Sequence, residues 1–371
     1  MTLQSPYSYP SVGFTSTTQQ YTTISGVDSN LLSIDIYHHN DYQTVSRPVV
    51  IYIHGGAWAL GDKSVVDSKP KFFNNLGYVF ISVNYRLSDS TLPATAYNTW
   101  PANRVKHPNH INDCAKAVTW IYNHISSYGG NQNKLVLIGH SAGAHLVSLL
   151  STNQSYLTAA GFPSGKIVGC ISLDTEANSG IYKQITEPVA DGEFDPNKLK
   201  RFYLNAFGIY PDPSVTSVTG NGPTITTDFA TTADAQTSYD TASPNKYVSS
   251  SSIPPFLLFH RGDPDRVTRE NLFSTALQSE GKTRTVVTYP GDTTYTHAEI
   301  NDSIGAKNDP PIDTTTNLQK TLPPGVANVT TQIKNWITNL VPAPEISKST
   351  TVAGTDLTVS SSYTLNGKTY P

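Results

Sequence analysis

The sequence predicts an α/β fold in which a mostly parallel central sheet carries helices on both faces. The first observation is that short apolar runs alternate with segments of helical periodicity along most of the chain. The second is that residues 48–53 and 78–83 are almost continuously apolar, as strands buried in a parallel sheet are. The third is a glycine-rich turn at residues 139–143, between a predicted strand and a predicted helix.

The expected strands and helices follow from this periodicity. The strands are expected at residues 30–37, 48–53, 78–83, 134–138, 167–173, 253–259 and 284–289. The helices are expected at residues 67–76, 111–125, 144–150, 270–277 and 326–340.

Two regions interrupt the alternation. We expect an extended lead-in over residues 1–24, an α/β domain over 25–342 and a Thr/Ser-rich tail over 343–371. Within the domain, residues 180–252 contain few apolar residues and many Thr, Ser, Asp, Pro and Gly. This composition indicates an insertion that forms a cap or a long loop over the carboxyl edge of the sheet.

Composition narrows the functional classes. The 371 residues include 25 basic and 28 acidic side chains, for a net charge of −3, which argues against nucleic-acid binding. Ser and Thr together number 83, more than all charged residues, which favours a secreted or extracytoplasmic protein. No stretch approaches the roughly 18 apolar residues of a membrane span. Residues 1–10 lack the basic start and apolar core of a signal peptide.

The chain has two cysteines, Cys114 and Cys170. They are too few for a disulfide framework or a cysteine-based zinc site. Cys114 falls in a predicted helix and Cys170 in a predicted strand, so we expect two buried free thiols.

Gly139-His140-Ser141-Ala142-Gly143 fits the pattern G-x-S-x-G. It begins where the strand 134–138 ends and stops where the helix 144–150 begins. Such a sharp turn strains the serine backbone and lifts the hydroxyl above the sheet, and only small residues fit beside it. We therefore predict that Ser141 is a nucleophile and that the helix N-terminus is directed at the reaction centre.

His54-Gly55-Gly56-Ala57-Trp58 follows directly on the strand 48–53. A carbonyl oxygen becomes anionic under nucleophilic attack, and backbone N–H groups that approach it closely can stabilise it. We expect His54 to hold this loop by a hydrogen bond, and Trp58 either to line a pocket or to pack in the core. The candidate N–H donors of this oxyanion hole are the amides of Gly56, Ala57 and Ala142.

A serine nucleophile needs a base, and the base needs a carboxylate that orients it. In folds with this kind of turn the order along the chain is Ser, then Asp or Glu, then His. His297 lies in the loop after the last predicted strand and is the predicted base. His297-Ala298-Glu299 also fits the H-x-E of zinc deaminases, but the chain has no P-C-x-x-C partner. We therefore expect no metal and no organic cofactor.

The carboxylate is expected after the strand 253–259. Asp263 and Asp265 both qualify, and Asp174, which follows the preceding strand, is a third and weaker choice. Any of the three can instead cap a turn or a helix. Asp265 stands where the next segment becomes helical, so a helix-terminal role suits it.

These motifs resemble those of α/β-hydrolases of the esterase and lipase group that carry an H-G-G oxyanion motif. The resemblance covers about residues 25–340 and implies an α/β-hydrolase fold and a serine hydrolase that cleaves carboxylic esters. The turn that carries Ser141 is called the elbow below. Its sequence, Gly-His-Ser-Ala-Gly-Ala-His-Leu at residues 139–146, is also similar to that of kynurenine formamidases. The segments that resemble the bacterial feruloyl and acetyl esterase-like branch are residues 51–61, 84–88, 107–125 and 139–149.

The resemblance also bears on the acid. Asp263-Pro264-Asp265-Arg266 is similar to the D-P-x-R stretch of hormone-sensitive-lipase-like esterases, whose Asp is the triad acid, and this implies Asp263. Two positions depart from the family pattern: Arg261 replaces the usual Gly after His260, and Ala57 replaces a third Gly.

The predicted ligand is a small-molecule or carbohydrate-linked ester. Hydrolysis of a formamide or another amide is the nearer alternative. A hydrolase-fold binding protein that has lost catalysis is the more distant one, and the presence of Ser141, Asp263 and His297 argues against it.

Overall fold

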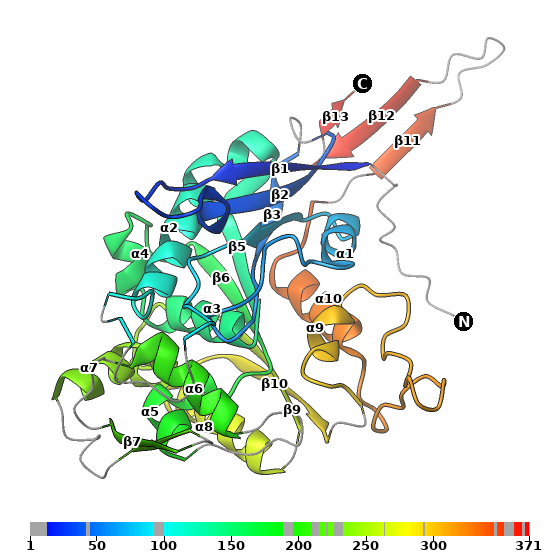
Figure 1. The fold of residues 1–371 in the computed structure, drawn as a ribbon. Helices are drawn as coiled ribbons and strands as arrows, with labels where there is room; N and C mark the ends of the chain where they lie inside the picture. The colour runs from blue at the N-terminus through cyan, green and yellow to red at the C-terminus, as the bar shows by residue number, and fades with distance from the viewer. Residues whose placement is uncertain are drawn as a thin grey trace.

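The centre of the molecule is an eight-stranded sheet in the order β1-β2-β4-β3-β5-β6-β9-β10 (Figure 1). In this computed structural model the described residues are 13–41, 45–92, 100–101, 103–187, 196–208, 215–219, 222–225, 233–262, 264–291, 294–344, 347–351, 360–365 and 368–370. The strands β1 and β2, and β2 and β4, pair antiparallel, and all other neighbours in the sheet are parallel. The strands are β1 Phe14–Gln20, β2 Ser33–His39, β3 Arg47–Ile53, β4 Val79–Val83, β5 Gly130–His140, β6 Ile167–Leu173, β9 Phe256–Gly262 and β10 Arg284–Pro290.

Helices cover both faces of this sheet, with α2 and α3 on one side and α1 and α10 on the other (Figure 1). Strand β3 shows why two cores form, because Val49, Ile51 and Ile53 point into the core under α2 and α3 while Val50 and Tyr52 point into the core under α1 and α10. The helices are α1 Lys69–Asn75, α2 Asn109–His124, α3 Ala142–Thr152, α4 Ser155–Ala159, α5 Ile181–Thr186, α6 Pro196–Phe207, α7 Ala233–Thr241, α8 Pro264–Ser279, α9 Glu299–Asp302 and α10 Val329–Leu340.

The expected fold class is confirmed, and the boundaries shift by a few residues. The segment expected to be a strand from residue 30 begins with a 3-10 turn, Ser29–Leu32, before β2. Strand β1 lies in the segment expected to be an extended lead-in. Its sequence, FTSTTQQ, lacks an apolar face because it pairs only with β2 at the edge of the sheet and stays largely exposed. Both Cys114 and Cys170 are buried free thiols, as expected.

The region expected to be an insertion, residues 180–252, contains the helices α5, α6 and α7. It also contains the hairpin of β7 Val215–Thr219 and β8 Gly222–Ile225. In the tail, β11 Ser347–Thr351, β12 Ser360–Leu365 and β13 Lys368–Tyr370 form a separate three-stranded sheet. No helix in the described ranges is both long enough and apolar enough to cross a membrane.

Candidate active site

Ser141 stands at a strained turn between β5 and α3. Its backbone has φ 54° and ψ −119°, a region of backbone angles that residues other than glycine rarely occupy. Two backbone hydrogen bonds hold the turn: the Ser141 N–H donates to the Leu173 carbonyl at 2.9 Å, and the His145 N–H donates to the Ser141 carbonyl at 3.1 Å. The predicted elbow geometry is therefore present, and α3 starts at Ala142 directly behind the serine.

The glycines of the elbow are required because the chain packs against itself there. A Cβ on Gly139 would overlap the Gly143 carbonyl, and a Cβ on Gly143 would overlap the Ile53 carbonyl at the end of β3. The backbone of the turn at Ser141 therefore packs closely against the end of β3 and the loop that follows it.

That loop after β3 carries three consecutive left-handed residues. Gly56, Ala57 and Trp58 have φ values of 106°, 52° and 58°. The turn closes through the Leu60 N–H, which donates to the Gly56 carbonyl at 2.8 Å. Among the described residues, the amides of Gly56 and Ala57 donate to no backbone carbonyl. The loop thus presents main-chain N–H groups beside the serine.

The flanking residues of this loop hold it in place. His54 Nδ1–H donates to the Gly55 carbonyl at 2.8 Å, and the His54 ring stacks on Tyr85. Trp58 both lines the cavity described below and packs in the core. Its indole N–H donates to His145 Nδ1 at 3.3 Å. His145 Nε2–H in turn donates to the Ala242 carbonyl at 2.7 Å. Burial lowers the pKa of His145 to about 4, which keeps the neutral form that this arrangement needs.

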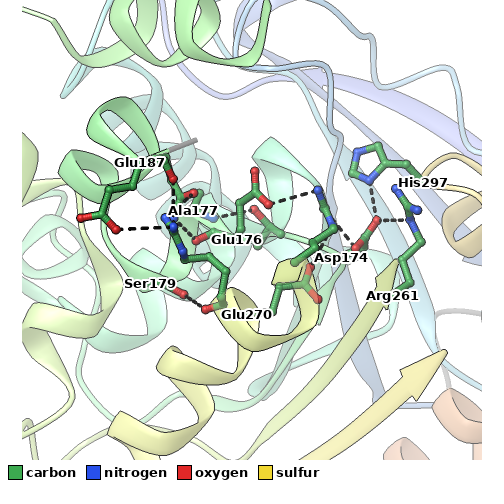
Figure 2. Close-up of polar contacts among 12 residues, drawn as sticks. Asp174, Glu176, Ala177, Ser179, Glu187, Arg261, Glu270 and His297 are labelled. Carbon is green, nitrogen blue, oxygen red and sulfur yellow. Dashed lines mark hydrogen bonds and ion pairs between the residues drawn. The ribbon is translucent and has the colours of Figure 1, made fainter. Parts of the chain in front are cut away.

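His297 lies between β10 and α9 and reaches back to the end of β6. Its Nδ1 lies 2.5 Å from Oδ2 of Asp174 (Figure 2). A carboxylate can only accept here, so the proton is on Nδ1 and the lone pair of the neutral ring is on Nε2. The His297 backbone carbonyl also accepts a hydrogen bond from His140 Nε2–H at 2.8 Å, which fixes the loop against the elbow.

Asp174 follows β6 directly and is fully buried. Its backbone is left-handed, with φ 52°, and its N–H donates to the Phe259 carbonyl of β9 at 3.0 Å. The sequence-based preference for the acid was Asp263, which lies outside the described residues, and this geometry favours the weaker alternative, Asp174, instead. Asp265 is exposed in the first turn of α8, which agrees with the helix-terminal role expected for it.

Two arginines surround the carboxylate of Asp174. Arg261 Nε lies 2.7 Å from Oδ2, and Arg266 Nη2 lies 3.1 Å from Oδ1. Burial alone would raise the pKa of Asp174. The charges of Arg266 and His297, the hydrogen bond from His297 and the charge of Arg261 outweigh burial and hold this pKa well below its usual value. Asp174 is therefore a carboxylate at neutral pH.

Ser141, His297, Asp174 and the loop at Gly56 line one cavity of about 400 Å³. Trp58, Leu60, Phe202 and Tyr203 make much of its wall apolar, and the last two come from α6. The predicted site residues that line the cavity are Gly56, Ala57, Ser141, Ala142 and His297, together with Asp174.

His140, Asp174 and His297 bring potential metal-ligand atoms within 4.8 Å of one another. Two observations disfavour a cation at this position. The carboxylate of Asp174 already contacts two guanidinium groups, and His140 uses Nε2 as a donor to a carbonyl. Burial also holds the pKa of His140 well below its ordinary value, so its ring is neutral.

Sequence reasoning did not identify Arg261, Arg266 and Glu176 as part of the site. Arg261 was visible only as a departure from the family pattern. Arg266 and Glu176 line the cavity, and Arg266 Nη1 lies 3.2 Å from Oε2 of Glu176. The available signal was the pair of arginines five residues apart around Gly262 and Asp263.

Comparison with known proteins agrees with the fold. The BD-FAE family model matches residues 34–279. The Mycobacterium tuberculosis proteins named "Probable carboxylic ester hydrolase LipM" and "Esterase LipQ" are 36% and 34% identical over 118 and 141 residues, or 31% and 36% of this chain. The chain spans only 24% and 28% of the length of these two relatives. The crystal structure of esterase B from Lactobacillus rhamnosis has a similar fold, with a TM-score of 0.52, 19% identity and 75% of each chain covered.

Proposed function

The chain belongs to the BD-FAE family and has an α/β-hydrolase fold, and on that premise we propose that it hydrolyses carboxylic esters through an acyl-enzyme on Ser141. The observation that carries this proposal is the cavity in which Ser141, the His297–Asp174 pair and the left-handed loop at Gly56 converge. The names of the relatives, carboxylic ester hydrolase and esterase, support the same reaction.

The proposed mechanism assigns one role to each group. Ser141 Oγ attacks the ester carbonyl while His297 Nε2 takes its proton, and the same proton is then given to the departing alcohol. Asp174 holds the Nδ1–H tautomer of His297 and stabilises the imidazolium that forms. A water molecule then attacks the acyl-enzyme with His297 acting again as base, which releases the carboxylic acid and restores Ser141.

The amides of Gly56, Ala57 and Ala142 are the proposed oxyanion hole. All three residues line the cavity beside Ser141. The Ala142 amide is at the first position of α3, where N–H groups have no partner inside the helix. Preorganised donors of this kind contribute about 10²–10³ each to turnover in serine hydrolases.

The lining of the cavity supports a neutral ester with an apolar or aromatic part. Trp58, Phe202 and Tyr203 offer ring faces and edges to such a group. Small-molecule and carbohydrate-linked esters are the proposed substrates, and a secreted location rests on composition alone. A formamide would use the same attack and the same amides, so it belongs in the substrate panel.

The first test is Ser141→Ala assayed with p-nitrophenyl acetate, together with a serine-directed phosphonate. We expect the variant to fold and to lose turnover, and we expect wild type to be labelled at Ser141 alone. Ser155→Ala, at the exposed start of α4, is the matched control and should retain full activity. A folded wild type with neither turnover nor labelling would support the binding-protein alternative.

A substrate panel then separates the remaining alternatives. It contains p-nitrophenyl esters, feruloyl esters, acetylated sugars and N-formylkynurenine. Ester turnover well above formamide turnover is the expected result, and the opposite order would identify a formamidase.

A further inference from the structure

A buried network of charged side chains surrounds the carboxylate of Asp174 (Figure 2). Arg261, at the end of β9, donates from Nε to Oδ2 of Asp174 at 2.7 Å. Arg266, on α8, donates to Oδ1 of Asp174 at 3.1 Å and to Glu176 at 3.2 Å. Arg266 Nε also lies 3.5 Å from the carboxyl group of Glu270 one turn later.

The oxygen Oδ2 of Asp174 contacts both His297 and Arg261. Oδ2 accepts from both His297 Nδ1 and Arg261 Nε, and Figure 2 shows both side chains directed at it. Arg266 contacts the other oxygen, Oδ1. The carboxylate is therefore held at both oxygens, and rotation about its terminal bond would break contacts on both sides.

The charges in this network are close to balanced. Asp174 and Glu176 are paired with Arg261 and Arg266. Burial and the neighbouring Asp174 raise the pKa of Glu270 well above its usual value, which favours the neutral form of Glu270. Removal of either arginine would leave one uncompensated negative charge beside His297.

We propose that Arg261 and Arg266 are positioning residues that hold Asp174 as an oriented carboxylate and thereby set the pH range in which His297 acts as a base. This inference rests on the proposed function. Neither arginine touches the reacting atoms; both act through Asp174 on the imidazole. A net negative charge favours the protonated, inactive imidazolium, so the two arginines extend activity to lower pH.

The titratable and charged groups around this pair come from every neighbouring element. His140 ends β5, Glu176 follows β6, and His260 lies on β9. Burial keeps both His140 and His260 neutral by lowering their pKa values, to about 4 for His260. The charge of Lys69, on α1, also lowers the pKa of His140. The arginines are thus the cations that contact the acid directly among the described residues.

The test compares pH profiles of kcat/KM for four variants. Arg261→Met removes one charge and Arg261→Lys keeps it. Arg261→Gln removes the charge but keeps a buried N–H donor, and serves if the Met variant does not fold. Arg269→Met is the matched control. Arg269, on α8, is a buried arginine like Arg261, but it contacts Gln184 and Glu187 rather than Asp174. Phosphonate labelling of Ser141 first establishes that each variant is folded and competent.

We expect the acidic limb of the Arg261→Met or Arg261→Gln profile to move to higher pH by about one pH unit. On the plateau kcat should fall about tenfold, because the carboxylate loses one of its orienting donors. Arg261→Lys should keep the limb of wild type and lose only part of kcat, since an ammonium retains the charge but not the planar fork. Arg269→Met should leave both the acidic limb and kcat unchanged.

A folded neutral variant with an unmoved limb overturns the inference, and so does an equal movement in Arg269→Met. If neither neutral variant folds, Arg261 is structural and the inference is likewise rejected. Failure of the proposed function looks different, because wild type itself would then show neither turnover nor labelling at Ser141.

Discussion

His297 Nδ1 and Asp174 Oδ2 lie 2.5 Å apart although the two residues are separated by 123 positions in the chain. The strands that precede them in the chain, β10 and β6, are not neighbours in the sheet, because β9 lies between them. The carboxyl ends of parallel strands share one edge of the sheet, and this places both side chains over the elbow at Ser141.

The first prediction concerns the acid. Asp174→Asn should fold and lose about 10⁴ in turnover, because an amide cannot stabilise the imidazolium and favours the wrong tautomer of His297. Steady-state kinetics with p-nitrophenyl acetate measures this. The control is Asp265→Asn in the exposed first turn of α8, where we expect a loss of about 0.5–2 kcal/mol of stability at most. A large loss in Asp263→Asn together with near-normal Asp174→Asn would return the assignment to Asp263.

The second prediction concerns the base. Activity of wild type should rise with pH along an acidic limb, because only neutral His297 can accept the serine proton. His297→Ala should remove both the activity and this limb. The exposed His124, replaced by Gln, provides a control with unchanged kinetics. Residual activity with the same limb in His297→Ala would identify a different base.

The third prediction is that catalysis needs no metal. Exhaustive EDTA treatment should leave ester hydrolysis unchanged, because Asp174 is already bound by two guanidinium groups and the chain supplies nucleophile, base and oxyanion donors. Activity is measured before and after dialysis. A large loss that zinc or calcium restores would contradict this expectation.

The fourth prediction is that acid destabilises the fold. Burial lowers the pKa of His54 and His140, and it also lowers the pKa to about 4 for His39, His145 and His260 and to about 3 for His107 and His110. In the unfolded chain these groups protonate near pH 6.5. Their contribution is complete above that pH and is lost as pH falls towards 3–4, by up to about 1.4 kcal/mol per histidine and pH unit.

Thermal unfolding between about pH 7.5 and pH 5 measures this loss as a falling Tm. His110→Gln should flatten the dependence, because one buried group no longer gains a proton on unfolding. His124→Gln should not change it, since that ring is exposed. A Tm independent of pH over this range would show that the buried histidines protonate without unfolding.

The turn at Ser141 and the loop at Gly56 could both be predicted from the sequence. The turn at Ser141 is local, and its requirements are visible in order: an apolar strand, two glycines without room for a Cβ, and an apolar helix. The loop at Gly56 is equally local, since it follows β3 without a break. Both features depend on consecutive residues, so a local sequence pattern is enough to predict them. The fold class is predicted in the same way, from the alternation of strand and helix patterns along the chain.

The proposal of Asp174 as the acid, in contrast, depends on tertiary contacts. Three aspartates follow predicted strands, and each has the local character of a turn or helix-terminal residue, so no pattern of consecutive residues distinguishes them. What distinguishes Asp174 is a left-handed backbone at the end of β6 and a carboxylate that meets His297, Arg261 and Arg266, which come from three other parts of the chain. Contacts across so many residues depend on strand order and side-chain burial, which arise only when the sheet is assembled.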